Sequence, residues 1–539
     1  MGIKRRFKQK QPFAYIGIMM LFLIVVPIMF SLQKLLETSN QWSFIVENVL
    51  YTYVSQSVIL VFSVVFLSVV IGISAAVIVT KYSFKGKKVL EVLLYLPMAV
   101  PPYVLSYIYV DTLSFQGRIY RIFQALGMQL HINVFSLFMA IWVLSLSLYP
   151  YIYIPMKAYF RQQDDMYDDA AKLLHMSWFK RLIKIHIPML MPTLISASMF
   201  VLFEAMNDYG VSKYLNIKTL TVGMFDTWFQ LNDMTAAFYL AFIYIGFIIV
   251  ITLLYQLYHR HKHVAKAGHY QKKHPKKLTG WKIFVYVGLL WTLLVVSLGI
   301  PLFELLLNVF SALSTTSIMP FIEALINSLM IALIASGIIM FLALLMGNFY
   351  RFVKHKWLKK MSNIVVIGYA LPGVMIALIY YVFFIELDMI FSPVYHVFNL
   401  GGLVLSLSIW MLIAALVFRF FAIGYRQVIA SYASIGMKQT LAAYTLHTSK
   451  FKTLFFIDVP MIKKGFIAGF IISFVDIVKE LPMTLLLRPF NMQTLSTLTY
   501  TYMNNEDIIG ASLSSLAIVL LSMALILILT RKRKDQYVS

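Results

Sequence analysis

Long apolar runs separated by short polar segments follow one another along the whole chain. A helix needs about 20 predominantly apolar residues to cross the hydrocarbon core of a bilayer. The fifth and eleventh runs are the weakest, because ionisable residues fall near their ends. The pattern predicts an all-α, polytopic membrane protein with twelve transmembrane helices, centred on 13–32, 57–79, 90–112, 133–155, 189–208, 236–257, 283–310, 326–348, 362–386, 400–424, 465–487 and 508–530.

Composition narrows the class of protein further. The 539 residues are 60% hydrophobic and only 13% charged, and the mean hydropathy is +0.80. A soluble domain needs a polar exterior, so this chain is neither a soluble enzyme nor a disordered scaffold. It has no cysteine, which excludes disulfides, thiolate catalysis and cysteine-ligated metals.

The basic residues behind the net charge of +24 indicate how the chain is oriented in the membrane. A nucleic-acid binder carries its basic residues as a stripe on a soluble domain, whereas here they form short clusters between apolar runs. The expected surroundings are therefore the lipid bilayer, with no nucleic acid. If the N-terminus is cytoplasmic, 39 of the 46 Lys and Arg lie in cytoplasmic segments, among them 419–464, and six lie outside. The positive-inside rule then predicts that both termini are cytoplasmic.

Residues 169–189 and 441–461 are two copies of one repeat. Eleven of the 21 positions are identical at a fixed offset of 272. Such an internal repeat predicts two tandem homologous halves of six helices each. An even number of spans gives both halves the same orientation, so they are related by an axis along the membrane normal. We expect a first half over 1–257, a basic cytoplasmic linker over 258–282 and a second half over 283–539.

Each copy lies in a large cytoplasmic loop between the fourth and fifth spans of its half. Ala-Ala-x-x-Leu favours a short helix, Ser177 and Ser449 can cap a second one, and Pro188 and Pro460 stand where the next span begins. A short surface helix of this kind can dock into a groove on a cytoplasmic partner. The alternative is a basic amphipathic loop that rests on lipid headgroups. The presence of the repeat in both halves favours docking.

These residues resemble the EAA loop of binding-protein-dependent ABC importer permeases, in which Glu-Ala-Ala-x3-Gly is followed by Pro. The resemblance implies the type I ABC importer permease fold and a coupling helix that fits a cleft in a separate cytoplasmic ATP-binding subunit, present in two copies. The Glu of the motif is Asp169 in one half and Leu441 in the other, so the second docking site lacks an acid. The positions expected to couple to the ATPase are Asp169, Ala170, Ala171, His175, Pro188, Ala442, Ala443, His447 and Pro460, with His175 and His447 in place of the Gly.

A second stretch is more specific. Residues 475–490 are similar to the Lys-Glu-Leu-Pro-x-Thr-Leu-Leu-Leu-Arg-Pro-Phe signature of fused ferric-iron-type permeases, and 96–105 and 203–210 match in the same order. The resemblance implies a permease of the bacterial plasma membrane that takes ferric iron from an extracytoplasmic binding protein. ATP is then used by the partner subunit, and this chain holds no cofactor. Relatives of this architecture carry phosphorylated sugars, phosphonates or thiamine. The spans show no ferric ligand cluster, so we expect the binding protein to select the solute.

Ionisable residues recur at matching places near the ends of the fifth and eleventh spans. Such groups inside a membrane tend to face protein or a cavity. One interpretation is that they meet at the pseudo-twofold axis and form a translocation gate. The other is a structural ion pair of the lysine with a neighbouring acid, which holds the halves together. The residues are Glu204 and Asp208 in the first half and Asp476, Lys479 and Glu480 in the second.

Signals for catalysis or resident metals are missing from the sequence. It contains no G-x-x-x-x-G-K-[ST] phosphate loop, H-E-x-x-H pair or Gly-x-Ser-x-Gly elbow, so we expect no enzyme activity. The histidines of the linker lie among lysines and arginines, which oppose metal binding, so we expect no metal site. A gradient-driven secondary transporter is the competing class, although it would not need matched docking loops.

Overall fold

The computed structural model describes residues 12–534, apart from 116, 129–131, 163–165, 261–275, 316, 354–367, 400–401, 436–437 and 447. Within these residues the fold is helical, with a single two-stranded pairing. In the described part of the chain, nine helices are long and apolar enough to cross a bilayer, and a bent helix pair makes ten. The twelve predicted spans therefore exceed the number that passes this test. Helices also occupy the two remaining predicted positions, but one has only a short apolar stretch, Val25–Leu36, among its described side chains, and the other carries four charged residues.

The elements of the first half begin with the helix over the first predicted span and end where the linker starts. In chain order they are α2 (Pro12–Gln33), η1 (Lys34–Leu36), α3 (Trp42–Asn48), α4 (Leu50–Lys81), β1 (Tyr82–Ser83), α5 (Lys87–Leu93), η2 (Leu96–Ala99), α6 (Pro102–Leu113), α7 (Arg118–Ala125), α8 (Leu137–Gln162), α9 (Met166–Leu173), α10 (Trp178–Arg181), η3 (Leu182–His186), α11 (Ile187–Asn207), α12 (Gly210–Tyr214), α13 (Leu220–Phe229) and α14 (Met234–Arg260).

The second half follows a strand at the end of the linker and repeats much of this order. Its elements are β2 (Lys276–Lys277), α15 (Trp281–Leu294), η4 (Val295–Gly299), α16 (Ile300–Thr315), α17 (Met319–Phe352), α19 (Gly373–Val397), α20 (Ile409–Ile435), α21 (Lys438–Thr445), α22 (Lys450–Thr453), η6 (Leu454–Asp458), α23 (Val459–Lys479), α24 (Pro482–Leu487), α25 (Leu495–Asn504) and α26 (Ile508–Lys534).

The predicted span over 90–112 is not one straight helix. The chain bends by 92° between the helical segments Lys87–Ala99 and Pro102–Ala125. Proline has no backbone N–H and disfavours helical geometry in the residue before it. Val100 precedes Pro101 and is extended, with φ −82° and ψ 115°, so the helix stops there and α6 restarts at Pro102. The proline run, not the hydropathy, fixes this break.

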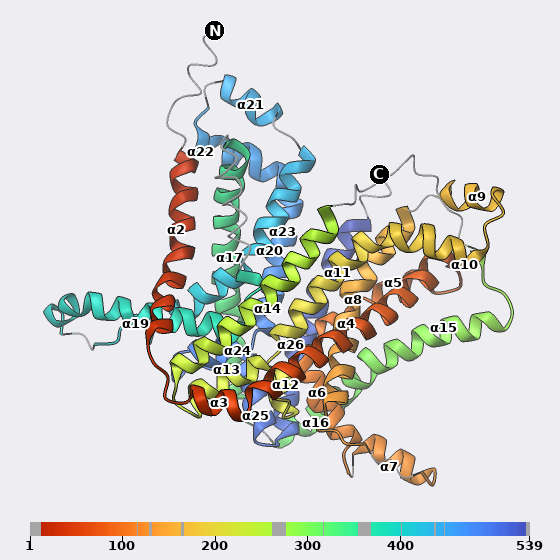
Figure 1. Cartoon of the computed structure of the whole chain (residues 1–539), viewed down its shortest axis with the longest axis horizontal. Helices are drawn as coiled ribbons and strands as arrows, with labels where there is room; N and C mark the ends of the chain where they lie inside the picture. Colours follow the sequence, from red (N-terminus) through yellow and green to blue (C-terminus); the bar gives the residue numbers. More distant parts are fainter. Residues whose placement is uncertain are drawn as a thin grey trace.

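The first membrane helix of each half packs against the other half (Figure 1). Helix α2 lies against α17 and α19, where the rings of Phe30 and Phe383 are 5.8 Å apart. Helix α16 lies against α6 of the first half and also against α26 of its own half. There the guanidinium of Arg118 pairs with the buried carboxylate of Glu304 and donates a hydrogen bond to Asn308, 3.1 Å long. The two halves are therefore interlocked rather than laid side by side.

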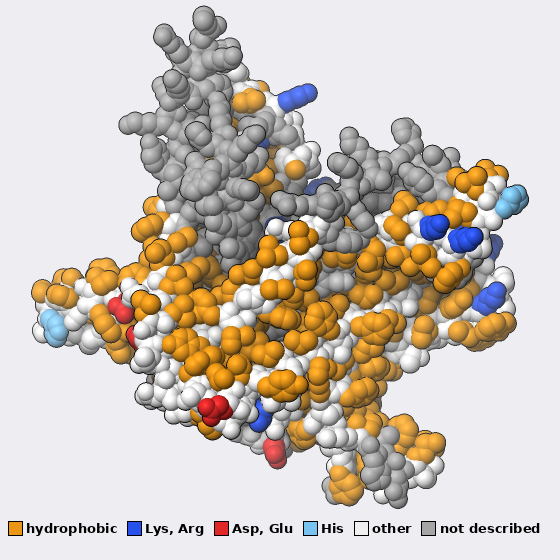
Figure 2. Space-filling model, in the orientation of Figure 1, with side chains coloured by type: hydrophobic (Ala, Val, Ile, Leu, Met, Phe, Trp, Pro, Cys, Tyr) orange, Lys and Arg blue, Asp and Glu red, His pale blue; other side chains and the backbone are white. Residues whose placement is uncertain are grey.

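The two loops with the repeated motif lie on the same side of the molecule. In Figure 1, α9 and α21 are at the upper edge together with the start of α2, while α3, α7 and α25 are at the lower edge. Figure 2 shows hydrophobic side chains over the middle of this face and most of the visible Lys and Arg near α9, α10 and α21. This arrangement agrees with the predicted grouping of basic residues.

One assignment in that grouping is wrong. The sequence places Arg419 in a cytoplasmic segment, but the structure places it inside α20, where its side chain is buried. Helix α20 starts later and ends later than the predicted span over 400–424. A buried cation in a membrane helix needs a partner, and its partner lies in the second half's broken span, described below.

The described end of the linker is tied to the first half. Strand β2 pairs in parallel with β1, which follows α4, and the ring of Tyr286 stacks on Tyr82 at 5.3 Å. Residues 261–275 of the predicted linker, including most of its histidines, lie outside the described residues. The part that is described is thus a structured connection on the side of α9 and α21.

Asp233 clips the N-terminal segment to the start of α14. Its carboxylate accepts hydrogen bonds from the amide of Ala236 (2.8 Å), the hydroxyl of Ser39 (2.7 Å) and the amide of Gln41 (3.1 Å). Burial raises the pKa of Asp233, but these hydrogen bonds outweigh it and hold the pKa below its usual value. The clip is consequently complete at neutral pH and weakens only as the pH falls through that lowered pKa.

Candidate translocation interface and coupling helices

Two membrane helices that occupy matching places in the repeat, α11 and α23, stop in the same way. Asp208 and Glu480 follow their last residues with almost the same backbone angles, φ −65° and ψ 128° against φ −67° and ψ 127°. Each residue leaves the helical region, and a short helix, α12 or α24, begins two residues later. The first turn of a helix has backbone N–H groups without intrahelical partners. Inside a membrane these groups must find partners within the protein.

The carboxylates of these two residues satisfy the N–H groups of the short helices. Asp208 accepts from the amides of Val211 (3.4 Å) and Ser212 (3.0 Å). Glu480 accepts from the amides of Met483 and Thr484, both at 3.0 Å. The backbone carbonyls match as well, because each accepts a hydroxyl hydrogen bond of 2.7 Å, from Thr221 to Asp208 and from Ser496 to Glu480.

This capping geometry corrects one sequence prediction. The sequence suggests that Asp476, Lys479 and Glu480 share one helical face, and likewise Glu204 and Asp208. The helices end before Asp208 and Glu480, so these two carboxylates turn back onto α12 and α24 and leave the face of their own helix. The end of the predicted span over 465–487 is accordingly a separate helix, α24.

Glu480 also neutralises the buried arginine of α20. The guanidinium of Arg419 lies 3.3 Å from the carboxylate of Glu480, and both side chains are at least nine-tenths buried. Gly373, the first residue of α19, makes room for this pair, since a Cβ atom there would lie 2.3 Å from the Arg419 guanidinium and 3.0 Å from Glu480. The sequence signal for Arg419 is a lone charge at the end of an apolar run, which the count of basic residues assigns to the cytoplasmic segment 419–464.

The remaining acids lie where the two halves meet, in a group that we call the interface cluster: Glu204, Tyr369, Asp476 and Lys479. The hydroxyl of Tyr369, from the second half, donates a 2.6 Å hydrogen bond to Glu204 of the first. Lys479 lies 3.3 Å from Asp476 and also donates to the carbonyl of Met98 in the first half, at 3.3 Å.

The two cross-interface contacts occupy matching places. Met98 stands three residues before Pro101, which precedes α6, and Tyr369 stands three residues before Pro372, which precedes α19. Glu204 lies close enough to Asp476 and Lys479 to interact with their charges, and Tyr151 of α8 lies near both acids. The structure therefore brings Glu204, Asp476 and Lys479 together and sets Asp208 and Glu480 apart as caps. Tyr369, which belongs to the interface cluster, and Tyr151, which lies near it, were not predicted from the sequence.

Helices α9 and α21 carry the repeated motif on the surface. The second alanine of each copy, Ala171 or Ala443, is buried, while the first, Ala170 or Ala442, is exposed. The leucines that follow, Leu174 and Leu446, expose 76% and 78% of their surface. Small residues thus let each helix lie close to the protein, and a leucine is left available for a partner.

The histidine that replaces the motif's glycine has a backbone that glycine adopts more easily. His175 has a φ of +50° directly after α9. Its amide donates to the carbonyl of Lys172 (2.9 Å), and the amide of Met176 donates to that of Ala171 (3.0 Å), which is the Schellman ending of a helix. Glycine pays no Cβ penalty there. His447 lies outside the described residues, as does the side chain of Asp169.

Each surface helix leads into a membrane helix through the same connection. Ser177 and Ser449 accept hydrogen bonds from the amides of Lys180 (3.5 Å) and Lys452 (3.2 Å), so the predicted caps are present. One turn of π-helix follows, η3 or η6, before α11 or α23. Pro188 and Pro460 are the second residues of α11 and α23, and the widened turn accommodates a residue that cannot donate its own hydrogen bond.

The second surface helix is anchored by a buried polar group. Asp458 of η6 accepts a 2.6 Å hydrogen bond from Thr440 of α21 and lies 3.3 Å from the guanidinium of Arg351 at the end of α17. Arg351 also stacks over the ring of Tyr432, 4.2 Å from its centre. In the first half, the fixed offset puts Asp168 and His186 in place of Thr440 and Asp458. The residues that anchor the second surface helix are therefore not repeated in the first half.

Comparison with known proteins identifies the family. Residues 68–264 and 339–533 each match the family described as "Binding-protein-dependent transport system inner membrane component". The chain belongs to this family. The permease therefore carries two copies of the family's domain, one in each half. It is a non-catalytic component of an ABC importer, in which a partner subunit hydrolyses ATP, and this decides against a secondary transporter.

Individual relatives of the permease are distant. It is 22% identical over 481 residues to the "Fe(3+)-transport system permease protein FbpB 2" of Haemophilus influenzae, and the match covers 87% of both chains. Two proteins called "Probable sulfate transport system permease protein cysT" match shorter parts. The one from Prototheca wickerhamii is 24% identical over 25% of the permease and 51% of its own length, and the one from Chlorokybus atmophyticus is 22% identical over 37% and 71%.

Removing the carboxylate of Glu480 should destabilise the permease more than removing that of Asp208. In Glu480→Met, Arg419 loses its partner, and an unpaired buried charge costs about 3–5 kcal/mol. Asp208→Asn loses only a cap, which costs about 1 kcal/mol. We expect a larger drop in the unfolding midpoint of the detergent-purified protein for Glu480→Met, with partial recovery in Arg419→Met/Glu480→Met. Equal midpoints for Glu480→Met and the double variant would contradict the pairing.

Proposed function

We propose that the permease forms the pathway by which ferric iron, delivered by an extracytoplasmic binding protein, enters the cell. A cytoplasmic ATP-binding subunit, in two copies, docks on α9 and α21, and both chain termini are cytoplasmic. The observation that carries the proposal is the matched pair of surface helices, each built on the same repeat and joined through a π-turn to a helix that ends at the interface between the halves.

These connections suggest how ATP use reaches the pathway. Helix α9 continues into α11, which carries Glu204, and α21 continues into α23, which carries Asp476 and Lys479. A rigid-body movement of the surface helices therefore changes the spacing of the interface cluster. Alternating access by such movements of packed elements is a common mechanism. In this proposal the cluster is the gate, and Asp208 and Glu480 hold the adjoining short helices in place.

Ferric iron is supported by the relative that matches across 87% of both chains and by the Lys479–Phe490 segment of the sequence. Sulfate is the solute named for the partial relatives. We favour ferric iron over sulfate because the iron-transport relative matches a much larger share of the chain.

Cells that lack their own ferric uptake, and that express the permease with its ATPase and binding protein, should accumulate radioactive iron from a ferric chelate. Labelled sulfate and a labelled hexose phosphate are the matched alternatives. We expect iron uptake that is lost when the ATPase is omitted. Accumulation of sulfate or sugar phosphate without iron would refute ferric iron as the substrate, whereas the role as an importer permease would stand.

A translocation gate and a structural ion pair predict different effects on the amount of permease in the membrane. Glu204→Gln and Lys479→Ala should lower uptake while membrane levels and the unfolding midpoint stay close to those of the parent, because both side chains are only partly buried and their loss strands no fully buried charge. Uptake that falls only in proportion to protein level would instead make the cluster a structural ion pair.

Loosening the anchor of α21 should uncouple ATP hydrolysis from transport. In Thr440→Val and Asp458→Asn the hydrogen bond between α21 and η6 is lost or weakened. Allosteric couplings of this kind are typically worth about 5-fold or more. We expect uptake to fall by about that factor with the ATPase still bound, as judged by co-purification. Lys452→Gln, an exposed change in the same loop, is the control, and an equal loss in that variant would contradict the assignment.

A further inference from the structure

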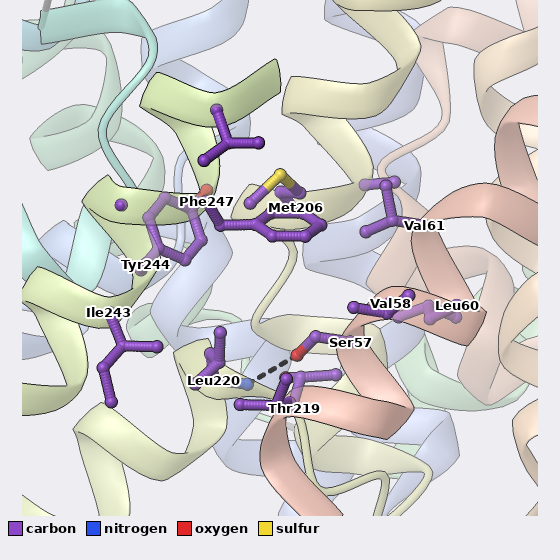
Figure 3. Close-up of a pocket in the computed structure, with 14 residues that line it drawn as sticks. Ser57, Val58, Leu60, Val61, Met206, Thr219, Leu220, Ile243, Tyr244 and Phe247 are labelled. Atoms are coloured by element: carbon purple, nitrogen blue, oxygen red, sulfur yellow. Dashed lines mark hydrogen bonds between the residues drawn. The ribbon is translucent and has the colours of Figure 1, made fainter. Parts of the chain in front are cut away.

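A cavity opens among four helices of the first half (Figure 3). Its volume is about 230 Å³. In Figure 3, Phe247 of α14 extends toward Met206 of α11 and Val61 of α4, and α13 closes one end with Thr219 and Leu220. The only side-chain hydrogen bond drawn among the lining residues joins the hydroxyl of Ser57 to the amide of Leu220, at 2.8 Å. Apolar side chains make up nearly all of the wall.

The mouth of the cavity faces the lipid. Val250 at its edge is 55% exposed, and Ile249 and Ile59 beside it are 51% and 50% exposed. Gly246 lines the opening, and a Cβ atom built there has no neighbour within 4 Å. Both α4 and α14 are candidate spans, so the mouth opens within the hydrocarbon layer, where acyl chains are the surrounding material.

A cation lies at the end of the cavity away from α9 and α21. Lys218 is exposed directly before Thr219, and its amide donates a 2.7 Å hydrogen bond to Gln56 of α4. No carboxylate pairs with its ammonium group among the residues that the structure describes. Helix α13 is on the lower side of Figure 1, opposite α9 and α21. An apolar slot next to an unpaired cation at the membrane edge matches a phospholipid, with its chain in the slot and its phosphate near the lysine.

A much smaller space lies at the matching place in the second half. The same hydrogen bond is present there, from the amide of Leu495 to the hydroxyl of Ser328 (2.7 Å). The corresponding space has a volume of only about 10 Å³, between Ile331, Ile477 and Val478 among others. At this matching place the two halves therefore differ in the space that they leave.

We propose that this cavity binds one acyl chain of a phospholipid from the leaflet on the side opposite α9 and α21, with the lipid phosphate beside Lys218. Apolar cavities of about 150 Å³ in proteins stay dry and accept molecules such as benzene, so a larger one open to acyl chains does not remain empty. An unfilled void would leave its lining without dispersion partners.

The bound chain would support the helix that carries part of the interface cluster. Met206 forms the cavity wall, while Glu204 is two residues earlier, about 200° around the helix, and faces the other half. Tyr244, another wall residue, donates a 2.6 Å hydrogen bond to Asn207 at the end of α11. The lipid therefore packs against α11 from the side opposite Tyr369.

The test uses the full-length permease in nanodiscs that contain a phosphatidylglycerol with a diazirine in the middle of one acyl chain. After illumination, peptide mass spectrometry maps the labelled residues. We expect label on Met206, which is only 6% exposed and is reached through the cavity, and on Phe341 of α17, which is 49% exposed and serves as the control. Gly246→Leu should lower labelling of Met206 at least several-fold and leave Phe341 unchanged.

The arms of the experiment separate the parts of the proposal. In Lys218→Gln, labelling of Met206 should fall toward that seen with an uncharged-headgroup lipid of the same chain. Val250→Trp blocks the mouth and replaces Gly246→Leu if that variant does not elute as a monodisperse protein. Absence of label on Met206 in the parent, or unchanged labelling in the blocked variants, overturns the site. Unchanged labelling in Lys218→Gln overturns the headgroup contact.

Discussion

The need to satisfy backbone N–H groups inside the membrane governs the centre of this permease. Helices α11 and α23 both stop within the protein interior, and the short helices that start after them, α12 and α24, would leave several N–H donors without water to accept them. A carboxylate at each break accepts two of these donors. That solution brings a charge into the interior, and in the second half it draws in Arg419 and requires a glycine at the start of α19. Much of the local arrangement follows from the two breaks.

The halves share their backbone hydrogen bonds more closely than their side-chain chemistry. Caps, hydroxyl contacts to carbonyls and π-turns recur at matching positions. By contrast, Asn207 stands where the second half has Lys479, and His186 where it has Asp458. Duplication thus preserved the features that satisfy the main chain, whereas the residues that face the partner half, the surface helices and the lipid diverged. A fused chain permits this because each half always meets the same neighbour.

The sequence predicted the class, the repeat and the positions of most helices, because apolar runs and a fixed offset are properties of the chain itself. It missed where helices break, because apolar residues continue on both sides of Pro101 and of Glu480, so a hydropathy run extends across each break. It assigned Arg419 to a loop, since the carboxylate that permits its burial lies 61 residues away in sequence. The charged residues of the interface cluster could be named from the sequence. Nothing in the sequence marked Tyr369, because tyrosines are common in apolar membrane segments.

The interlocked first helices have a consequence for biogenesis. Helix α2 is made before α17 and α19, and the surfaces that it covers on these helices follow it by more than half a chain. During synthesis α2 therefore stays in the lipid or against the insertion machinery until α17 and α19 have been made. A fragment that ends after the first half lacks α17 and α19, so the face of α2 that packs on them would stay in contact with lipid.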